Sequence, residues 1–263
     1  MMQISLLGCG WLGLPLAESF IEKGFTVKGS VTSPQKLELL NSKGIQPYLV
    51  SLTSTSVDGN VAEFLNKSDI LIIDIPPKLR TEGSESFTQK IEQLIPYIEQ
   101  AGISNILFIS SISVYGQKND GIVTEDTPPF PDTESGKQLL ETEKLLASNP
   151  NFKTTALRFA GLYGGERHPV YHLAGKQNLQ QPNAPVNLID RDSCIGVIEA
   201  IINKNSWGEV FNAALSQHPT RKEYYTQKAQ EMQLPLPEFT EDNNSAGKII
   251  SSQKIKTALG YSL

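Results

Sequence analysis

Residues 3–13 read QISLLGCGWLG, an apolar run followed by three glycines at fixed spacing. The glycines fit G-x-G-x-x-G, directly after a predicted strand at 3–7 and at the start of a predicted helix at 12–23. In this context Gly8 permits a tight turn, Gly10 lets a pyrophosphate approach the backbone, and Gly13 lets helix and strand pack closely. Anions are favoured at a helix N-terminus, where N–H groups are free. The stretch predicts a dinucleotide site formed by Gly8, Gly10, Trp11, Leu12 and Gly13.

Apolar runs and amphipathic runs alternate along the chain after this loop. Strands are expected at 25–30, 46–52, 69–75, 105–111 and 154–160, and helices at 34–43, 84–101 and 135–148. This alternation predicts an α/β fold, a doubly wound Rossmann-type parallel sheet with helices on both faces. From residue 161 onward the expected elements are shorter and prolines are more frequent. We therefore expect a dinucleotide-binding domain at 1–160 and mainly a smaller C-terminal substrate lobe at 161–263.

The composition excludes several functional classes. The chain has 263 residues with 23 basic and 28 acidic side chains, a net charge of −5, which argues against binding to nucleic-acid backbones. Two cysteines and three histidines favour neither a disulfide framework nor a metal site, so no metal ligands are assigned. A small-molecule substrate is the expected partner.

The apolar segment at 4–17 has the length of a signal-peptide core, but no Lys or Arg precedes it and glycines interrupt it. No run reaches the roughly 18–20 apolar residues that a membrane-spanning helix needs. These features predict a cytoplasmic protein with no membrane contact, and a homodimer is a further expectation.

The end of the second predicted strand bears on the choice of cofactor. NAD-preferring folds place Asp or Glu about 20 residues after the loop, to bind the ribose 2′-hydroxyl. Here residues 27–36 read VKGSVTSPQK, without a carboxylate. Ser30, Thr32, Ser33 and Lys36 are candidates to bind a 2′-phosphate instead, although Ser33 could simply cap the next helix. We expect NADP or NAD, with NADP slightly favoured, and assign Pro76, after the fourth strand, to the same cofactor site.

Several stretches, in the right order along nearly the whole chain, resemble the extended short-chain dehydrogenase/reductase family, the NAD-dependent epimerase/dehydratase group. They are NILFISSISVYG (105–116), TEDTPPFP (124–131), KQLLE (137–141), LRFAGLYG (157–164), NLIDRD (187–192) and GEVFNA (208–213). The resemblance implies an NAD(P)-dependent oxidoreductase, epimerase or dehydratase acting on a nucleotide sugar or another small polar substrate.

In that family a Ser or Thr, a Tyr and a Lys act together, and the Lys lowers the pKa of the Tyr for proton transfer. The resemblance assigns Ser111 and Lys137 to two of these positions. Thr133 stands four residues before Lys137, where the Tyr belongs. An aliphatic hydroxyl is a poor base, so the chain resembles an atypical member that lacks the usual Tyr. A catalytically depleted NAD(P)-binding sensor or regulatory protein is therefore the alternative.

Other polar residues near these motifs are candidates for the missing role. Asp132, Glu134, Tyr163 and His168 are candidate replacement acids or bases, each with a structural role as the simpler interpretation. Candidate substrate-binding residues are Arg167 and Arg191, for a phosphate or carboxylate, and Tyr115, which is normally structural in the family. A salt bridge to Asp190 or Asp192 is the alternative for Arg191.

Overall fold

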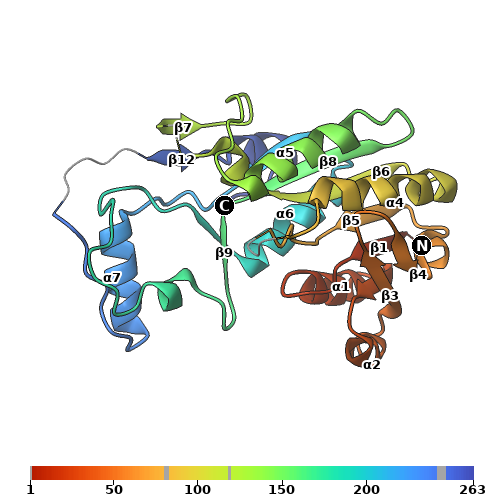
Figure 1. Ribbon diagram of the computed structural model, residues 1–263, viewed down its shortest axis with the longest axis horizontal. Coiled ribbons are helices and arrows are strands. Elements are labelled where there is room, and N and C mark those ends of the chain that lie inside the picture. Colours follow the sequence, from red (N-terminus) through yellow and green to blue (C-terminus); the bar gives the residue numbers. More distant parts are fainter. Residues whose placement is uncertain (1, 80–82, 118–119, 242–246) are drawn as a thin grey trace.

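The computed structural model describes residues 2–79, 83–117, 120–241 and 247–263. An eight-stranded sheet forms its centre, in the order β11-β8-β6-β5-β1-β2-β3-β4, and every pairing in it is parallel except that of β3 with β4 (Figure 1). The strands are β1 Gln3–Leu7, β2 Thr26–Val31, β3 Gln46–Leu52, β4 Val57–Gly59, β5 Ile70–Ile73, β6 Asn105–Ser111, β8 Lys153–Phe159 and β11 Val210–Ala213. The α/β Rossmann-type fold expected from the sequence is confirmed.

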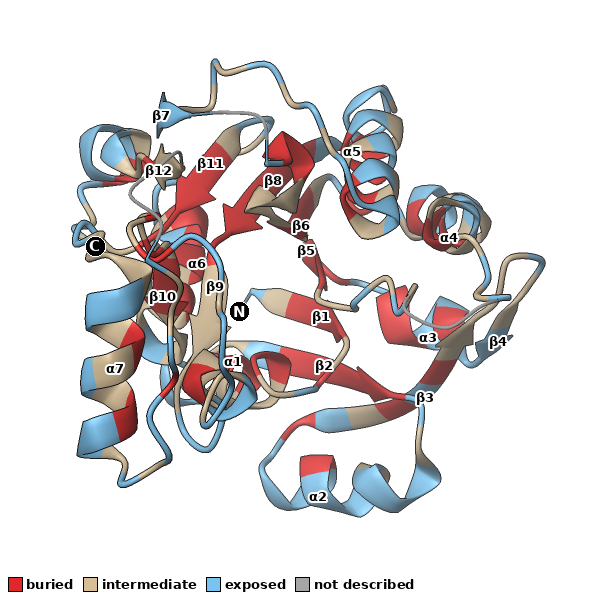
Figure 2. Cartoon of the chain, turned by 60° about the vertical axis from the view of Figure 1, so that its left-hand side comes forward, coloured by how far each residue is buried: buried red, intermediate tan, exposed pale blue. Residues whose placement is uncertain are grey.

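Helices cover both faces of the sheet. They are α1 Gly13–Glu22, α2 Leu37–Ser42, α3 Val61–Leu65, α4 Phe87–Ala101, α5 Glu134–Ala147, α6 Arg191–Asn203 and α7 Arg221–Glu231. Helix α4 packs against both α3 and α5 on one face. Helices α1 and α6 lie on the other face (Figure 2). Glu199 of α6 joins them, because it accepts a hydrogen bond from Ser19 and pairs with Lys23. The sheet is therefore buried on both sides, which explains why β5 is wholly apolar.

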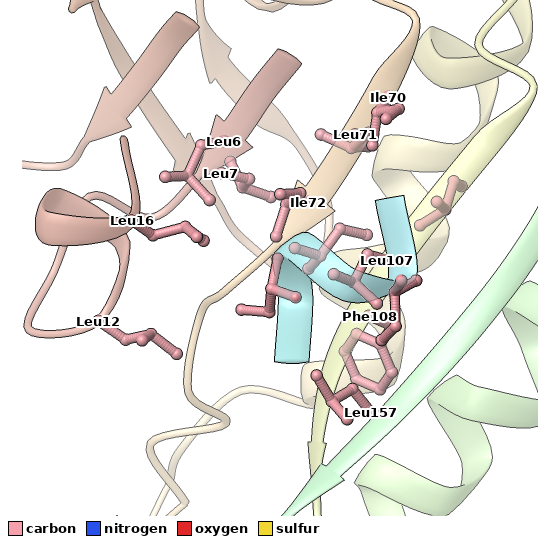
Figure 3. Packing of buried hydrophobic residues seen from close by; sticks show 14 of the residues in the cluster. Leu6, Leu7, Leu12, Leu16, Ile70, Leu71, Ile72, Leu107, Phe108 and Leu157 are labelled. Atoms are coloured by element: carbon pink, nitrogen blue, oxygen red, sulfur yellow. The ribbon is translucent and has the colours of Figure 1, made fainter. Parts of the chain in front are cut away.

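The main hydrophobic core lies between the sheet and these helices. Figure 3 shows apolar side chains of β1, β5 and β6 on both faces of the sheet, and Leu6, Leu71 and Leu107 are fully buried. The same cluster includes residues of α6 and β11. Within the described residues no helix is both long and apolar enough to cross a membrane.

A second, smaller hydrophobic cluster forms away from the sheet. It contains Val170, Val186, Leu188, Tyr225 and Ala229, and Figure 1 shows α7 set to one side of the sheet. Two short parallel pairs, β9 Gly161–Tyr163 with β10 Leu188–Asp190 and β7 Gly121–Val123 with β12 Lys248–Ile250, lie outside the main sheet. The domain boundary at residue 160 stays a prediction. Two elements from after residue 160, β11 and α6, pack with the large sheet.

The sheet order places one crevice at the expected position for a ligand. Strand β1 lies between β2 and β5, so the chain runs outward in opposite directions from the β1–β5 boundary. Open α/β sheets bind ligands at the carboxyl ends of the strands at such a switch point. Residues 8–13 follow β1 and residues 74–76 follow β5, so both segments lie at this boundary.

Candidate functional site

Hydrogen bonds to Ser30 of β2 hold the start of the glycine loop in place. The Gly8 amide donates to Ser30 Oγ at 3.0 Å, and the Cys9 amide donates to the Ser30 carbonyl at 2.8 Å. Ser30 itself is 2% exposed. Our suggestion that Ser30 binds a 2′-phosphate is therefore wrong, because its side chain supports the loop and faces away from solvent.

The three glycines differ in the space around them. Gly8 has φ +108°, and a Cβ there would lie 2.3 Å from the Asp74 carbonyl oxygen; a Cβ on Gly13 would lie 2.1 Å from the Gly8 oxygen. A Cβ on Gly10 would meet no atom within 4 Å. Gly8 and Gly13 thus allow the chain to pack closely, whereas the Gly10 face is open to a ligand.

Backbone donors at the start of α1 complete this cradle. Trp11 and Leu12 directly precede α1, and in the described chain their amides donate to no backbone acceptor. Leu12 is 3% exposed, so it contributes through its amide and not its side chain. Two free amides beside an open glycine fit a pyrophosphate group.

Asp74 is a site residue that the sequence analysis did not select. It follows β5, and a Cβ on Gly13 would lie 3.2 Å from its carboxyl oxygen Oδ2. Burial raises the pKa of this carboxyl to about 8, while a hydrogen bond from the Gly13 amide and the charge of Arg167 act in the opposite direction. A carboxyl group that is largely neutral near pH 7 does not repel a phosphate at the loop. An acidic residue ending a buried strand was the signal that could have identified it.

The predicted 2′-phosphate residues lie just beyond β2. Thr32 and Lys36 are exposed and Ser33 is half-buried. Ser33 precedes Pro34 at the N-cap position of a short helical turn, but its hydroxyl donates to Gln35 Oε1 and caps no backbone amide. Pro76, also exposed, lies two residues after Asp74 in the segment that follows β5.

Two arginines from the later part of the chain lie against the glycine loop. The guanidinium carbon of Arg167 is 4.9 Å from the centre of the Trp11 ring, and that of Arg191 is 5.6 Å from it. Arg167 follows β9, and Arg191 is the first residue of α6. The structure therefore brings together both predicted substrate-binding arginines and a predicted cofactor-binding residue.

The predicted catalytic residues surround the start of α5. Ser111 ends β6 and its hydroxyl accepts the Ser113 amide at 3.1 Å. Thr133 is the N-cap of α5, where its hydroxyl accepts the Gly136 amide at 3.1 Å. Lys137 lies one turn later and is exposed. A Cβ on Gly136 would lie 2.6 Å from the Ser113 carbonyl oxygen, so the first turn of α5 packs against the segment that follows Ser111.

The candidate replacements for the missing Tyr already have partners. An Asp132 carboxyl oxygen accepts the Gln117 amide at 2.7 Å, and Glu134 accepts the Gln138 side chain at 2.6 Å. Both carboxylates are exposed. These contacts are structural, and they leave neither carboxylate poised as a buried base.

Tyr163 and His168 belong to an aromatic group with Tyr224 in the smaller cluster. His168 Nδ1 accepts the Val170 amide, and its Nε2 lies 3.1 Å from the Tyr224 hydroxyl. The Tyr163 ring packs edge-on against His168. Burial lowers the pKa of His168 and raises that of Tyr163. A neutral imidazole with both nitrogens engaged is consistent with the structural interpretation.

Tyr115 is placed in the core. It is 0% exposed, and its hydroxyl lies 2.7 Å from Arg158 Nη1 and 3.0 Å from Asn212 Oδ1. Arg158 also forms a buried ion pair with Glu143 at 2.6 Å. Direct substrate contact by Tyr115 does not fit this position, because the residue joins β6 to β8 and β11 inside the protein.

Comparison with known proteins places this architecture in a family. No family model matches the chain. Protein YeeZ of Escherichia coli strain K12 is 35% identical over 263 residues, covering 99% of this chain and 95% of that protein. The chain belongs to the YeeZ family.

Solved structures share the fold of this YeeZ-family chain. A protein from Methylobacillus flagellatus, described as an NAD-dependent epimerase/dehydratase, is 26% identical with a TM-score of 0.79, covering 100% of this chain and 92% of that one. The UDP-glucuronic acid 4-epimerase of Bacillus cereus, solved in complex with NAD, is 20% identical with a TM-score of 0.79, covering 99% and 91%. The resemblance of the sequence motifs to the epimerase/dehydratase family is confirmed. Within the described part of this YeeZ-family chain, no group of His, Cys, Asp or Glu side chains could hold a metal ion.

Proposed function

We propose that this YeeZ-family protein binds a nicotinamide dinucleotide at its glycine loop and acts as an oxidoreductase, epimerase or dehydratase on a nucleotide sugar or another small polar substrate. The observation that carries the proposal is the open face at Gly10 beside the free amides of Trp11 and Leu12, at the switch point of the sheet. The solved relatives named above support the substrate class and the cofactor.

The residues present would hold the cofactor along the carboxyl edge of the sheet. The loop amides would bind the pyrophosphate, and Thr32, Ser33 and Lys36 would bind a 2′-phosphate, because no carboxylate ends β2. This supports NADP over NAD. The bound nicotinamide would supply the hydride acceptor or donor.

The catalytic proposal rests on Ser111 and Lys137. Lys137 would hold the nicotinamide ribose, and the Ser111 hydroxyl would orient a substrate hydroxyl. Thr133 would not replace the missing Tyr, because its oxygen already accepts the Gly136 amide and an aliphatic hydroxyl does not reach a near-neutral pKa. Since general acid–base help contributes typically about 10²–10⁴-fold, ordinary family substrates would react more slowly by a factor of that order.

A second candidate function is a dinucleotide-binding sensor that does not turn substrate over. The helix-capping role of Thr133 favours it, because the position that should carry the acid–base group serves the fold instead. The expectations of a cytoplasmic location and a homodimer stay predictions.

A turnover assay separates the two candidates. Purified protein is mixed with UDP-glucose and either NADP or NAD, and reduction of the nicotinamide and epimerisation of the sugar are followed. We expect slow turnover in the wild type, an increase in Thr133→Tyr, and a loss in Lys137→Ala. Lys144→Ala, on the same helix, is the control. If wild-type turnover is fast and Lys137→Ala does not change it, the site assignment is wrong. If dinucleotide binds but neither wild type nor Thr133→Tyr turns substrate over, the result favours the sensor.

A further inference from the structure

Trp11 carries two positively charged neighbours that come from separate parts of the chain. Its ring lies 4.9 Å from the Arg167 guanidinium carbon and 5.6 Å from that of Arg191. Cation–π contact accounts for one such group on an indole. Two guanidinium groups gathered at one ring repel each other, so an anion bound between them would be stabilised by both charges.

No carboxylate of the described residues neutralises these arginines. Neither guanidinium lies within 4.0 Å of an Asp or Glu oxygen there. Asp190, the sequence neighbour of Arg191, instead caps α6: its carboxyl oxygens accept the Ser193 amide at 2.8 Å and the Ser193 hydroxyl at 2.6 Å. The salt bridge considered for Arg191 is thus not formed with Asp190, and neither arginine forms an ion pair with a carboxylate of the described residues.

Two buried N–H groups at the same place also lack partners. The indole Nε1 of Trp11 and the Nε of Arg191 are both buried, and neither donates to an acceptor among the described residues. Buried donors are nearly always hydrogen-bonded, because an unpaired one costs free energy. Both groups are donors, so the missing partner must be an acceptor.

The chain after β9 keeps space next to these donors. Gly164 has φ +131°, and a Cβ there would lie 3.2 Å from Arg191 Cβ and 3.8 Å from the Trp11 ring. Gly165 has φ +57°, and its Cβ would lie 3.5 Å from Arg191 Nη1. Side chains at these positions would press on Arg191, whereas two glycines leave space beside it.

Asp74 is the remaining charged group near Arg167. Its carboxyl group interacts with the Arg167 charge, yet burial raises its pKa to about 8. At neutral pH this carboxyl is largely protonated, so it leaves most of the positive charge at Arg167 available to a ligand.

We propose that Arg167, Arg191 and the Trp11 indole N–H together bind the diphosphate group of a nucleotide ligand. A diphosphate supplies several acceptor oxygens and two negative charges, which match two guanidinium forks and the unpaired indole donor. The glycine loop beside Trp11 favours the same chemistry. This inference deepens the proposed function and rests on it, since a nicotinamide dinucleotide and a nucleotide sugar both carry the diphosphate.

Tryptophan fluorescence gives a direct test, because the chain has only two tryptophans. Trp207, whose Nε1 donates to Asn205, is replaced in a Trp207→Phe background so that Trp11 alone reports. NADP, NAD, UDP-glucose and inorganic pyrophosphate are titrated separately, with calorimetry in parallel. Arg167→Gln and Arg191→Gln are compared with Arg221→Gln, which removes a guanidinium whose Nη1 donates to the Gln180 carbonyl on the small lobe.

We expect at least one diphosphate ligand to change Trp11 fluorescence. The affinity for that ligand should fall about tenfold or more in Arg167→Gln and in Arg191→Gln. In Arg221→Gln it should stay within about twofold of the wild-type value. Sensitivity confined to NADP and NAD identifies the dinucleotide as the source of the diphosphate, and sensitivity confined to UDP-glucose identifies the nucleotide sugar. Thermal unfolding checks the fold of each variant. Should a Gln variant not fold, Arg→Lys at the same position keeps the charge and removes the fork, and the same loss of affinity is expected.

Two results would overturn the inference. In the first, a dinucleotide binds, and both arginine variants bind the dinucleotide and UDP-glucose with wild-type affinity. The proposed function then stands without this diphosphate site. In the second, none of the four ligands binds. If UDP-glucose binding depends on the two arginines but no dinucleotide binds, the diphosphate site stands and the cofactor proposal fails.

Discussion

Asp74 shows how one residue can reconcile two opposed requirements of the site. A polar side chain beside the glycine loop accepts the Gly13 amide, yet a charged one would repel a pyrophosphate. Burial resolves the conflict, because it disfavours the ionised form and raises the pKa of Asp74 to about 8. The carboxyl group then remains a hydrogen-bond partner without carrying a full negative charge at neutral pH.

This pKa predicts how stability depends on pH. An unfolded Asp has a pKa of about 3.9, so between that value and about 8 the folded protein binds more protons than the unfolded chain. The free energy of unfolding should therefore fall as pH rises through this range, by at most about 1.4 kcal/mol per pH unit from this group. Asp74→Asn keeps an acceptor for Gly13 and removes the titration.

Unfolding by denaturant at several pH values between about 5 and 9 measures the effect. The difference in free energy of unfolding between wild type and Asp74→Asn isolates this carboxyl, since all other groups are shared. It should shift in favour of the variant as pH rises. If the free energies of unfolding of the two proteins depend on pH in parallel, the pKa of Asp74 is not raised in the folded state.

Element boundaries show what the sequence could and could not predict. Strands at 3–7, 46–52 and 105–111 were predicted with their observed bounds, because apolar runs ended by glycine or polar residues carry a clear signal. Three-residue β4 and five-residue α3 were missed because such short elements leave no periodic pattern. The sequence showed that Thr133 stands where the family has its Tyr. It did not show that Thr133 is the N-cap of α5, because that assignment depends on where the helix begins.

The proposed preference for NADP depends on the residues at the end of β2. Val31, the last residue of the strand, is only 6% exposed, so a carboxylate placed there would be buried and would disturb the fold. Thr32 is the next residue and is exposed. The NADP proposal is therefore tested at Thr32.

We predict that Thr32→Asp shifts the ratio of NAD to NADP affinity toward NAD by about tenfold or more, equivalent to about 1.4 kcal/mol. The added carboxylate repels a 2′-phosphate and accepts a ribose hydroxyl. Thr32→Asn has nearly the same shape without the charge and serves as the control. Calorimetric titration with both dinucleotides gives the ratio, and a wild type that already prefers NAD would refute the NADP preference.

The candidate site is assembled from segments that are remote in sequence. The alternation of strands and helices predicted the doubly wound parallel sheet, and the structure shows its switch point between β1 and β5. The contact of Trp11 with Arg167 and Arg191 did not, because it depends on how the chain after β9 and the start of α6 return to the glycine loop. Spacing along the sequence carries no information about such a tertiary contact.

Binding of a nicotinamide dinucleotide at the glycine loop is tested by calorimetric titration of wild type and Gly10→Asp with NADP and NAD. The Gly10 face is open, so the variant should unfold at the same temperature as the wild type. Gln230→Glu, which adds one negative charge on exposed α7, is the control. We expect a dissociation constant in the micromolar range or lower for wild type and for Gln230→Glu, and no measurable binding for Gly10→Asp. Equal binding by Gly10→Asp, or no binding by the folded wild type, would contradict the assignment of the glycine loop as a dinucleotide site.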